Sequence, residues 1–330
     1  MKNTVKRIPL STTLCCTELS DRRILVTGDR FIKVFSLDTY KEIKDIPSRG
    51  ENWDCLVVPE RNMAFIVSNK GLNQYSLPEF SLAKVHEPES VGFCLAYLKA
   101  KDTVLFKHKS KLLSLDLETS TVSGLESAHK KNIYSIVSTS DEKFVFTTGQ
   151  DDTLKKWSTD PWSVVRSVEL ESEGRSLLIT AESNSILLGT LFGFICEFSI
   201  DHLSLIRRVI AHYNLILKII QLSSGDVLTC SLDGSVCLPF RDNTPIKVSD
   251  GSINSITELS DKTIACCCDD GLRIIPSPAK NPPLVEKAKV TSSTLDPISY
   301  TLDSLSSSID SIRASTSDKK TQLVSLLQHH

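Results

Sequence analysis

Three side chains that stand close together in the sequence could do acid–base chemistry. His129 supplies an imidazole, Thr148 a hydroxyl and Asp151 a carboxylate. A histidine between a hydroxyl and a carboxylate is the arrangement of a nucleophilic triad, in which the imidazole takes the proton of the attacking hydroxyl. A buried histidine can also use the same two partners to hold strands together without any reaction. The sequence contains no sign of an activated nucleophile, so we expect the structural role.

The elements that would position these side chains are short strands. Three runs with alternating apolar residues, 132–137, 143–148 and 153–157, are separated by turn residues. Such alternation predicts strands, and the short turns between them predict an antiparallel β-meander. Trp157 in the third run would add an indole N–H donor and a large apolar ring to the group.

The stretch from residue 128 to 157 resembles one blade of the WD-repeat β-propeller family. The matching residues are His129 after a small residue, Thr148 at the end of the second strand, Asp151 in the next tight turn and Trp157 in the third strand. In that family, residues at these places form a structural tetrad joined by hydrogen bonds. The resemblance therefore implies an all-β fold, and it assigns these four residues to a tetrad rather than to catalysis.

The position of Trp157 recurs along the chain with the period of a propeller, which is about 40–45 residues. The recurring positions are Phe35, Tyr75, Leu115, Trp157, Phe198, Pro239 and Ile275. The steps between them are 40, 40, 42, 41, 41 and 36. Histidine recurs in part at the phase of His129, namely at His86 and His212. The spacing predicts seven divergent blades.

The seven blades are expected to form a ring that the N-terminal strand closes. Their predicted boundaries are 11–46, 53–86, 91–126, 132–170, 174–210, 214–248 and 252–275. The last blade has three strands before Pro276, and the spare run 4–10 can supply the fourth. Closure of this kind removes exposed sheet edges. Pro239 stands where blade six should have Trp, and Phe192 stands where blade five should have Asp, so a complete tetrad is expected in blade four alone.

The chain changes character after the propeller, which is expected to cover residues 1–275. Four prolines and a serine-rich stretch predict a linker over 276–296. Residues 297–330 have apolar residues at heptad spacing, which predicts an amphipathic helical tail. The apolar stripe consists of Ile298, Leu302, Leu305, Ile309, Ile312, Leu323 and Leu326. The tail could form a coiled coil by self-association or bind a partner helix; the alternatives are a helix folded back on the propeller and a disordered tail.

Composition argues against several classes of function. The chain of 330 residues has a formal net charge of −2 and no basic, aromatic-rich stripe, so no nucleic-acid partner is expected. It has no apolar run long enough to span a membrane and no signal-peptide core, which predicts a cytoplasmic or nuclear protein. The ten cysteines include no Cys-x-x-Cys pair, so buried free thiols are expected, with no metal site and no cofactor. His329 and His330, at the end of the chain, make no metal site alone.

The resemblance implies a non-catalytic protein-interaction scaffold, or an adaptor subunit of a multiprotein complex. In WD-repeat proteins, the loops that enter the first strand and those that join the second strand to the third form a face that binds partners. The matching positions here are Trp53, Lys130, Lys131, Asn132, Gln150, Asn214 and Ser252. Trp53 could be an exposed aromatic anchor or a core residue at the start of a strand.

Two other functions remain as alternatives. Some propellers bind phosphoinositides at a membrane surface through Phe-Arg-Arg-Gly at the end of blade five, and residues 205–209 read Leu-Ile-Arg-Arg-Val. The match is partial, since Ile206 replaces the phenylalanine and Val209 the glycine. A propeller enzyme is the third candidate. It is disfavoured because a turn position explains each loop carboxylate and no acids stand in pairs beyond that role.

Overall fold

The computed structural model describes residues 5–48, 50–86, 92–125, 129–180 and 185–280. Within these ranges the helical elements are two 3₁₀ turns, η1 (Pro59–Arg61) and η2 (Pro278–Lys280), and the other regular elements are strands. No helix in this part of the chain is long and apolar enough to cross a membrane. The chain divides into two units, Met1–Pro283 and Leu284–His330. The predicted linker beyond residue 280 and the predicted helical tail lie outside the described residues.

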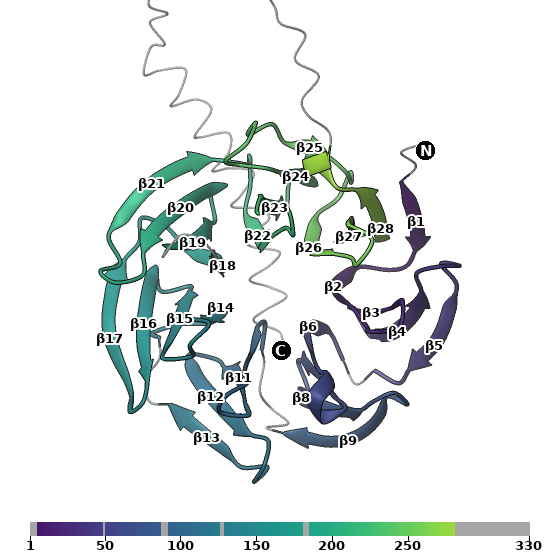
Figure 1. The fold of residues 1–330 in the computed structure, drawn as a ribbon, viewed down its shortest axis with the longest axis horizontal. Coiled ribbons are helices and arrows are strands. Elements are labelled where there is room, and N and C mark those ends of the chain that lie inside the picture. The colour runs from purple at the N-terminus through teal and green to yellow at the C-terminus, as the bar shows by residue number, and fades with distance from the viewer. Residues whose placement is uncertain (1–4, 49, 87–91, 126–128, 181–184, 281–330) are drawn as a thin grey trace, which may run out of the picture. The chain divides into compact units, whose positions relative to one another are not determined.

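The strands form seven antiparallel sheets of four strands each. Figure 1 shows these sheets as blades around a common centre, with one strand of each blade innermost. Blades one to three consist of β2 (Thr13–Glu18), β3 (Arg23–Gly28), β4 (Phe31–Ser36) and β5 (Glu42–Ile46); β6 (Asn52–Val58), β7 (Met63–Ser68), β8 (Gly71–Ser76) and β9 (Ser81–His86); and β10 (Leu95–Leu98), β11 (Thr103–His108), β12 (Lys111–Asp116) and β13 (Val122–Leu125). Blades four and five consist of β14 (Ile133–Ser138), β15 (Phe144–Gly149), β16 (Thr153–Thr159) and β17 (Trp162–Glu169), and of β18 (Gly174–Ile179), β19 (Ser185–Thr190), β20 (Phe194–Ser199) and β21 (Leu205–Ile210). Blade six consists of β22 (Ile216–Gln221), β23 (Val227–Ser231), β24 (Ser235–Cys237) and β25 (Ile246–Lys247), and blade seven of β26 (Ile253–Glu258), β27 (Thr263–Cys268), β28 (Gly271–Pro276) and β1 (Lys6–Pro9). The predicted seven-bladed, all-β propeller is confirmed.

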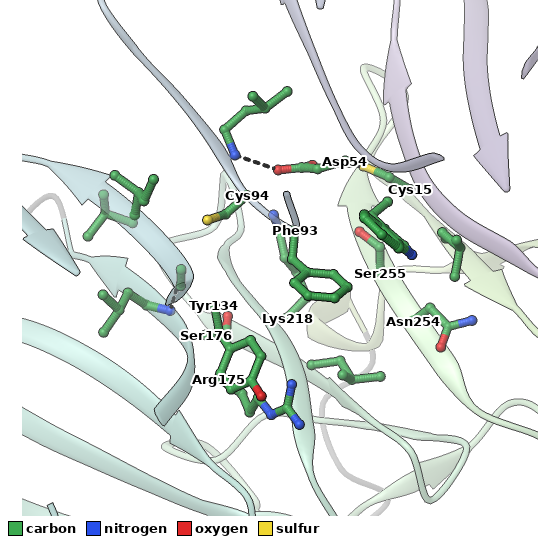
Figure 2. Close-up of a pocket in the computed structure, with 18 residues that line it drawn as sticks. Cys15, Asp54, Phe93, Cys94, Tyr134, Arg175, Ser176, Lys218, Asn254 and Ser255 are labelled. Atoms are coloured by element: carbon green, nitrogen blue, oxygen red, sulfur yellow. Dashed lines mark hydrogen bonds between the residues drawn. The ribbon is translucent and has the colours of Figure 1, made fainter. Parts of the chain in front are cut away.

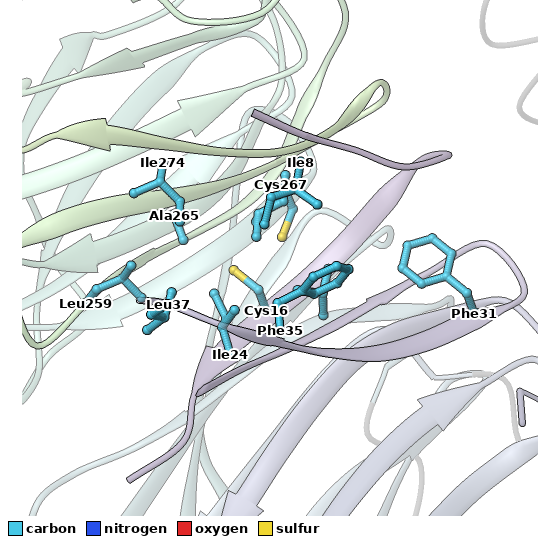
Figure 3. Packing of buried hydrophobic residues seen from close by; sticks show 12 residues of the cluster. Ile8, Cys16, Ile24, Phe31, Phe35, Leu37, Leu259, Ala265, Cys267 and Ile274 are labelled. Atoms are coloured by element: carbon cyan, nitrogen blue, oxygen red, sulfur yellow. The ribbon is translucent and has the colours of Figure 1, made fainter. Parts of the chain in front are cut away.

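The N-terminal strand closes the ring, as predicted. Strand β1 pairs with β28 in an antiparallel register that runs from Lys6 opposite Ile274 to Pro9 opposite Gly271. Ile8 in this strand is buried in a cluster shared with blade one (Figure 3). The fourth strand of blade seven therefore comes from the opposite end of the propeller. This pairing leaves β28 without a free edge.

The core consists of seven apolar clusters, each between two neighbouring blades. The cluster in Figure 3 joins Cys16 and Phe35 of blade one to Cys267 of blade seven. The next ones join blade one to blade two and so on around the ring. Most strand residues point alternately to the two faces of their sheet, and both faces are covered by a neighbour, so the central strands read as apolar runs.

The recurring aromatic position is a buried residue of the third strand in six blades. Trp157 is 3% exposed, and Tyr75 is 2% exposed. Blade six is the exception, because β24 stops at Cys237, before Pro239. Proline has no N–H to donate to the ladder and is avoided inside sheets. The sixth blade accordingly has the shortest third and fourth strands of the ring.

Eight of the ten cysteines are buried, as expected. All ten are free thiols. Adjacent cysteines of β27 serve different interfaces: Cys267 contacts blade one, whereas Cys266 and Cys268 belong to the cluster shared with blade six. Their alternation follows the two-residue period of a strand.

Candidate functional site: the loop face and the channel mouth

A buried hydrogen-bond network joins three strands of blade four. His129 Nδ1 lies 2.7 Å from Asp151 Oδ1, and His129 Nε2 lies 2.8 Å from the hydroxyl of Thr147. Trp157 Nε1 donates to the same hydroxyl over 2.9 Å. The network has the four groups of the predicted tetrad. Its hydroxyl belongs to Thr147, however, and not to the predicted Thr148.

The strand period explains the one-residue correction. Neighbouring residues of β15 point to opposite faces of the sheet. Thr147 points toward His129 and Trp157, whereas the Thr148 hydroxyl donates to the carbonyl of Thr153. A Cβ at Gly174 of blade five would lie 2.1 Å from the Thr148 hydroxyl, so Thr148 faces the neighbouring blade. Because Thr147 and Thr148 are neighbours, the spacing of the motif could not decide which of them supplies the hydroxyl.

The geometry of this network is that of a structural tie. A carboxylate only accepts, so Nδ1 of His129 carries the proton, and Nε2 accepts from the Thr147 hydroxyl. Burial lowers the pKa of His129, although Asp151 opposes this, so the neutral ring is favoured. The side chains of His129 and Asp151 are 0% and 3% exposed. The hydroxyl is already engaged by both Trp157 and His129, and solvent does not reach it, so the geometry offers no open side for a substrate.

Blade six contains a related network. His212 Nε2 lies 2.8 Å from the Thr229 hydroxyl, and Nδ1 lies 2.9 Å from the Ser235 hydroxyl and 3.3 Å from Asp233 Oδ2. The Thr229 hydroxyl donates to the carbonyl of Cys237 at 3.2 Å. His212 thus occupies the structural place that its phase predicted, although no complete tetrad was expected in this blade. His86, the third residue of that phase, contacts Gln74 through Nε2 at 2.8 Å.

Turn carboxylates fix the loops of one face. Asp151, Asp233 and Asp269 lie between the second and third strands of their blades. Each accepts a hydrogen bond from a backbone N–H of the loop that enters the same blade. The donors are Lys130 at 2.8 Å, Tyr213 at 3.0 Å and Ser252 at 2.9 Å. These two sets of loops therefore form one connected surface, which we call the loop face.

The predicted partner-binding residues fall into two groups. Lys130 and Lys131 are exposed on the loop face. Asn132 accepts a backbone hydrogen bond from Gln150 at 2.8 Å, so these two lie together on blade four. Asn214 and Ser252 are half-buried at the same place in blades six and seven. Trp53 differs from them, because it lies inside the mouth of the central channel.

A bulge at the start of the innermost strand turns one side chain per blade toward the channel. In six blades the ladder between the first and second strands skips one residue at this place. A bulge leaves the extra residue unpaired and re-aims its side chain. With Phe93 at the matching place of blade three, the set is Leu14, Trp53, Phe93, Tyr134, Arg175, Leu217 and Asn254. We call these seven half-buried residues the channel ring.

The channel ring surrounds a cavity of about 120 Å³ (Figure 2). Three of its members form an aromatic wall: the ring centroids of Trp53 and Phe93 are 4.5 Å apart, and those of Phe93 and Tyr134 are 6.1 Å apart. The guanidinium of Arg175 stacks on Tyr134 at 3.7 Å from the ring centroid. Only Trp53 was predicted as a candidate from the sequence. The other members recur every 37 to 42 residues, a period that could have revealed them.

The residue after each ring member forms a second layer, deeper in the channel. Its members are Cys15, Asp54, Cys94, Ser135, Ser176, Lys218 and Ser255. Three of them accept a backbone N–H from the next blade: Asp54 from Leu95 at 2.9 Å, Ser135 from Leu177 at 3.1 Å, and Ser176 from Ile219 at 3.0 Å. This layer therefore ties neighbouring blades together.

Lys218 is the one cation of the second layer. Burial is the largest influence and opposes its charge, but Asp54 and the neighbouring Cys15, Cys55 and Cys230 together outweigh it and raise the pKa of Lys218. Lys107 lies close by, with its ammonium 4.3 Å from the centroid of Phe93. Burial lowers the pKa of Lys107 to about 8, and the positive charge of Arg175 adds to that decrease.

The arginines of the phosphoinositide-like motif already have partners. Arg207 forms an ion pair with Glu197 and lies over the ring of Phe240 at 3.9 Å. Arg208 forms an ion pair with Glu171 and lies 3.6 Å from the centroid of the Phe194 ring. Both guanidiniums would have to leave a carboxylate and an aromatic ring to bind a phosphate headgroup.

No protein-family model matches the chain, and no curated protein matches it either. Among solved structures, the chain is similar to the crystal structure of the WD40 beta propeller domain of Doa1. The TM-score is 0.69 at 16% sequence identity, over 83% of this chain and 95% of that chain. The fold is that of a WD40 β-propeller. This confirms the fold that the blade-four residues predicted, while the function has to be argued from the side chains of this chain.

Proposed function

We propose that the protein is a non-catalytic protein-interaction scaffold, an adaptor subunit whose loop face and channel ring bind partner proteins. WD40 propellers generally serve as protein-interaction scaffolds. The observation that carries the proposal is the channel ring. Seven half-buried side chains, three of them aromatic, stand around a cavity at the face where the loops are held rigid by Asp151, Asp233 and Asp269. Aromatic side chains in a recessed site are typical of interface hot spots.

The second part of the proposal concerns the C-terminal segment. The apolar stripe of residues 297–330, which lies outside the described residues, is proposed to bind a partner helix or a second copy of the chain. Cytoplasmic or nuclear placement remains part of the same proposal. The membrane-surface function receives less support, because Arg207 and Arg208 are both paired and stacked. Flotation with liposomes that contain phosphoinositides tests it, since retention of the protein at low salt would revive it.

Photo-crosslinking tests the scaffold function directly. A photoreactive amino acid replaces Gln150 on the loop face, and a control variant carries it at Lys84, an exposed residue of the outer strand β9. We expect proteins that crosslink at Gln150 and not at Lys84, and that are lost when Trp53 is replaced by alanine at a temperature where the fold persists. Equal crosslinking at both positions would contradict a dedicated loop face.

Affinity purification separates the two proposed surfaces. The intact chain is compared with a chain that lacks residues 277–330 and with the Trp53→Ala variant. Partners that depend on the tail should disappear from the truncated chain alone, whereas loop-face partners should disappear from the Trp53→Ala variant alone. If Trp53→Ala lowers stability and leaves every partner in place, Trp53 is a packing residue.

A further inference from the structure

Two thiols from neighbouring blades lie in contact beside the central channel. The sulfur of Cys55, in β6, lies 3.5 Å from the sulfur of Cys15, in β2. Successive side chains of β2 point to opposite faces, so Cys16 contacts blade seven whereas Cys15 is turned toward blade two. The sulfur atoms of a disulfide are about 2.05 Å apart, so the two thiols have to approach by about 1.5 Å to form one.

A carboxylate stands beside the first of these thiols. The Cys15 thiol donates to Asp54 Oδ1 over 3.3 Å, and the Cys55 thiol donates to the Cys15 sulfur. The thiolate is the nucleophile in cysteine chemistry, so a group that accepts the proton of Cys15 activates its sulfur. The hydrogen bond with Cys15 is the largest influence that raises the pKa of Cys55 well above its usual value, and burial adds to it. Cys55 therefore stays protonated while Cys15 can transfer its proton, which gives the two thiols different roles.

A small oxidant can reach Cys15 in the folded chain. Cys15 and Asp54 both belong to the wall of the cavity at the channel mouth (Figure 2), whereas Cys55 packs in the apolar cluster between blades one and two. A water molecule requires a space of about 10–15 Å³ measured in this way. The cavity of about 120 Å³ therefore has room for hydrogen peroxide beside the Cys15 sulfur.

We propose that Cys15 and Cys55 are a modification site, at which hydrogen peroxide forms a disulfide between blades one and two. The sulfur of Cys15 attacks one peroxide oxygen, so an S–O bond forms and the O–O bond breaks. Asp54 takes the proton of Cys15 and passes it to the departing hydroxide, which leaves as water. Cys55 then attacks the sulfur of the resulting sulfenic acid, and the second hydroxide leaves with the Cys55 proton as water. The two thiols lose two electrons, and peroxide is reduced to two molecules of water.

The disulfide ties together two innermost strands directly beside the channel ring. Cys15 follows the ring member Leu14, and Cys55 lies two residues after the ring member Trp53. The crosslink therefore fixes the distance between blades one and two at the channel mouth. This inference is separate from the scaffold function, because the disulfide can form whether or not a partner protein binds.

The chain offers two matched comparisons. Cys94 lines the same cavity, but among the described residues no hydrogen bond joins its thiol to a carboxylate or to a second sulfur, and burial raises its pKa to about 12. Cys16 and Cys267 face each other in an apolar cluster between blades one and seven (Figure 3), and the described wall of the cavity contains neither. We expect both comparisons to react more slowly than Cys15.

Mass spectrometry of the folded, full-length chain tests the proposal. After treatment with hydrogen peroxide and blocking of the remaining thiols, we expect a digest that contains a peptide linking Cys15 to Cys55. A thiol reductant should break this link and restore both thiols. A chain without the link, or one in which Cys16 is linked to Cys267 instead, would overturn the proposal.

Serine variants separate the roles of the two thiols. In Cys55→Ser, Cys15 should accumulate as a sulfenic acid that dimedone labels, whereas in Cys15→Ser dimedone should leave Cys55 unlabelled. Cys94→Ser is the control and should form the disulfide as fast as the unaltered chain. Labelling of Cys55 in Cys15→Ser would contradict the assigned order of the steps.

Replacement of the carboxylate tests how Cys15 is activated. Asp54→Asn should slow formation of the disulfide about tenfold or more, because an amide cannot take up the proton of Cys15. An unchanged rate would remove Asp54 from the reaction. If Asp54→Asn does not fold, dimedone labelling of Cys55→Ser still decides, since equal labelling of Cys15 and Cys94 would show that Cys15 is not activated.

Discussion

Thr147 donates its hydroxyl hydrogen to His129 Nε2 over 2.8 Å, inside a blade where neither side chain reaches solvent. The bond closes a chain that runs from Asp151 through the imidazole to the indole of Trp157. It joins the loop before the innermost strand to the second and third strands. A hydroxyl, an imidazole and a carboxylate thus serve here to hold a blade together, and each of their contributions to stability can be measured.

Removal of the histidine should destabilise the propeller. His129→Ala is expected to lower the free energy of unfolding by about 1–3 kcal/mol, because the carboxylate of Asp151 and the hydroxyl of Thr147 lose a buried partner. Urea titration followed by tryptophan fluorescence measures it. His202→Ala, at an exposed residue of blade five, is the control and should change stability by less than about 0.5 kcal/mol. If both substitutions lowered the free energy of unfolding equally, the hydrogen bonds of His129 would not stabilise the blade.

Replacement of Thr147 and replacement of Thr148, its neighbour, should lower the free energy of unfolding by different amounts. Thr147→Val removes the partner of both His129 and Trp157, and we expect a loss of about 2 kcal/mol or more. Thr148→Val removes one bond, to the carbonyl of Thr153, and should cost about 1 kcal/mol. Valine preserves the shape of threonine in both. If Thr148→Val proved the more harmful, the sequence-based tetrad would be right and the observed register wrong.

The closing strand should contribute to the stability of the whole ring. Ile8→Ala removes a side chain that is 7% exposed and packed against blades seven and one, so we expect a loss of about 2–5 kcal/mol. Val5→Ala, at a residue that is 49% exposed just before β1, should cost little. Thermal unfolding monitored by circular dichroism compares them. Ring closure by β1 predicts one cooperative transition that moves down in Ile8→Ala, and an unchanged midpoint would argue that the ring closes without β1.

Acid should weaken blade four through His129. Burial lowers the pKa of His129 below its usual value of about 6.5, so the unfolded chain binds a proton that the folded chain does not. The contribution of neutral His129 to the stability of the folded chain is complete above about pH 6.5 and decreases as the pH falls below that value. Below about pH 4, Asp151 adds to the loss, because its bonds to His129 and the Lys130 N–H, which outweigh its burial, lower its pKa in the folded state.

The matching measurement compares the unaltered chain with His129→Asn in urea at a series of pH values. The unaltered chain should lose more stability than the variant between about pH 7 and pH 5, since asparagine cannot take up the proton. Burial also lowers the pKa of His86. Because His86 is present in both proteins, its contribution to the pH dependence cancels when the two stabilities are subtracted. Parallel pH profiles would show that His129 is protonated as easily in the folded chain as in the unfolded chain.

Much of the fold was accessible from the sequence because a propeller repeats one local unit. The 40-residue step of the Trp157 position fixed the phase of the blades, and one spare run at the N-terminus matched one missing strand before Pro276. Blade six, with its early stop at Cys237, departs from the pattern where the sequence places Pro239. These features depend on alternation, turns and proline, which act over a few residues.

The candidate site was harder to predict from the sequence, because contacts between different blades determine which side chains come together there. Trp53 was selected as a single aromatic residue, and its neighbours Phe93 and Tyr134 are 40 and 81 residues away in the chain. The choice between Thr147 and Thr148 depends on which face of β15 turns toward His129, and adjacent identical residues carry no information on that.

By itself, the sequence determined how many units there are and how the ring closes, because periodicity and turn chemistry are local properties of the chain. The tertiary structure alone decided which side chains share the channel mouth. Bulges at the start of the innermost strands turn Trp53, Tyr134 and Arg175 toward the cavity, which Phe93 of blade three also lines. Charge and packing at that point depend on distances between blades, which only ring closure sets.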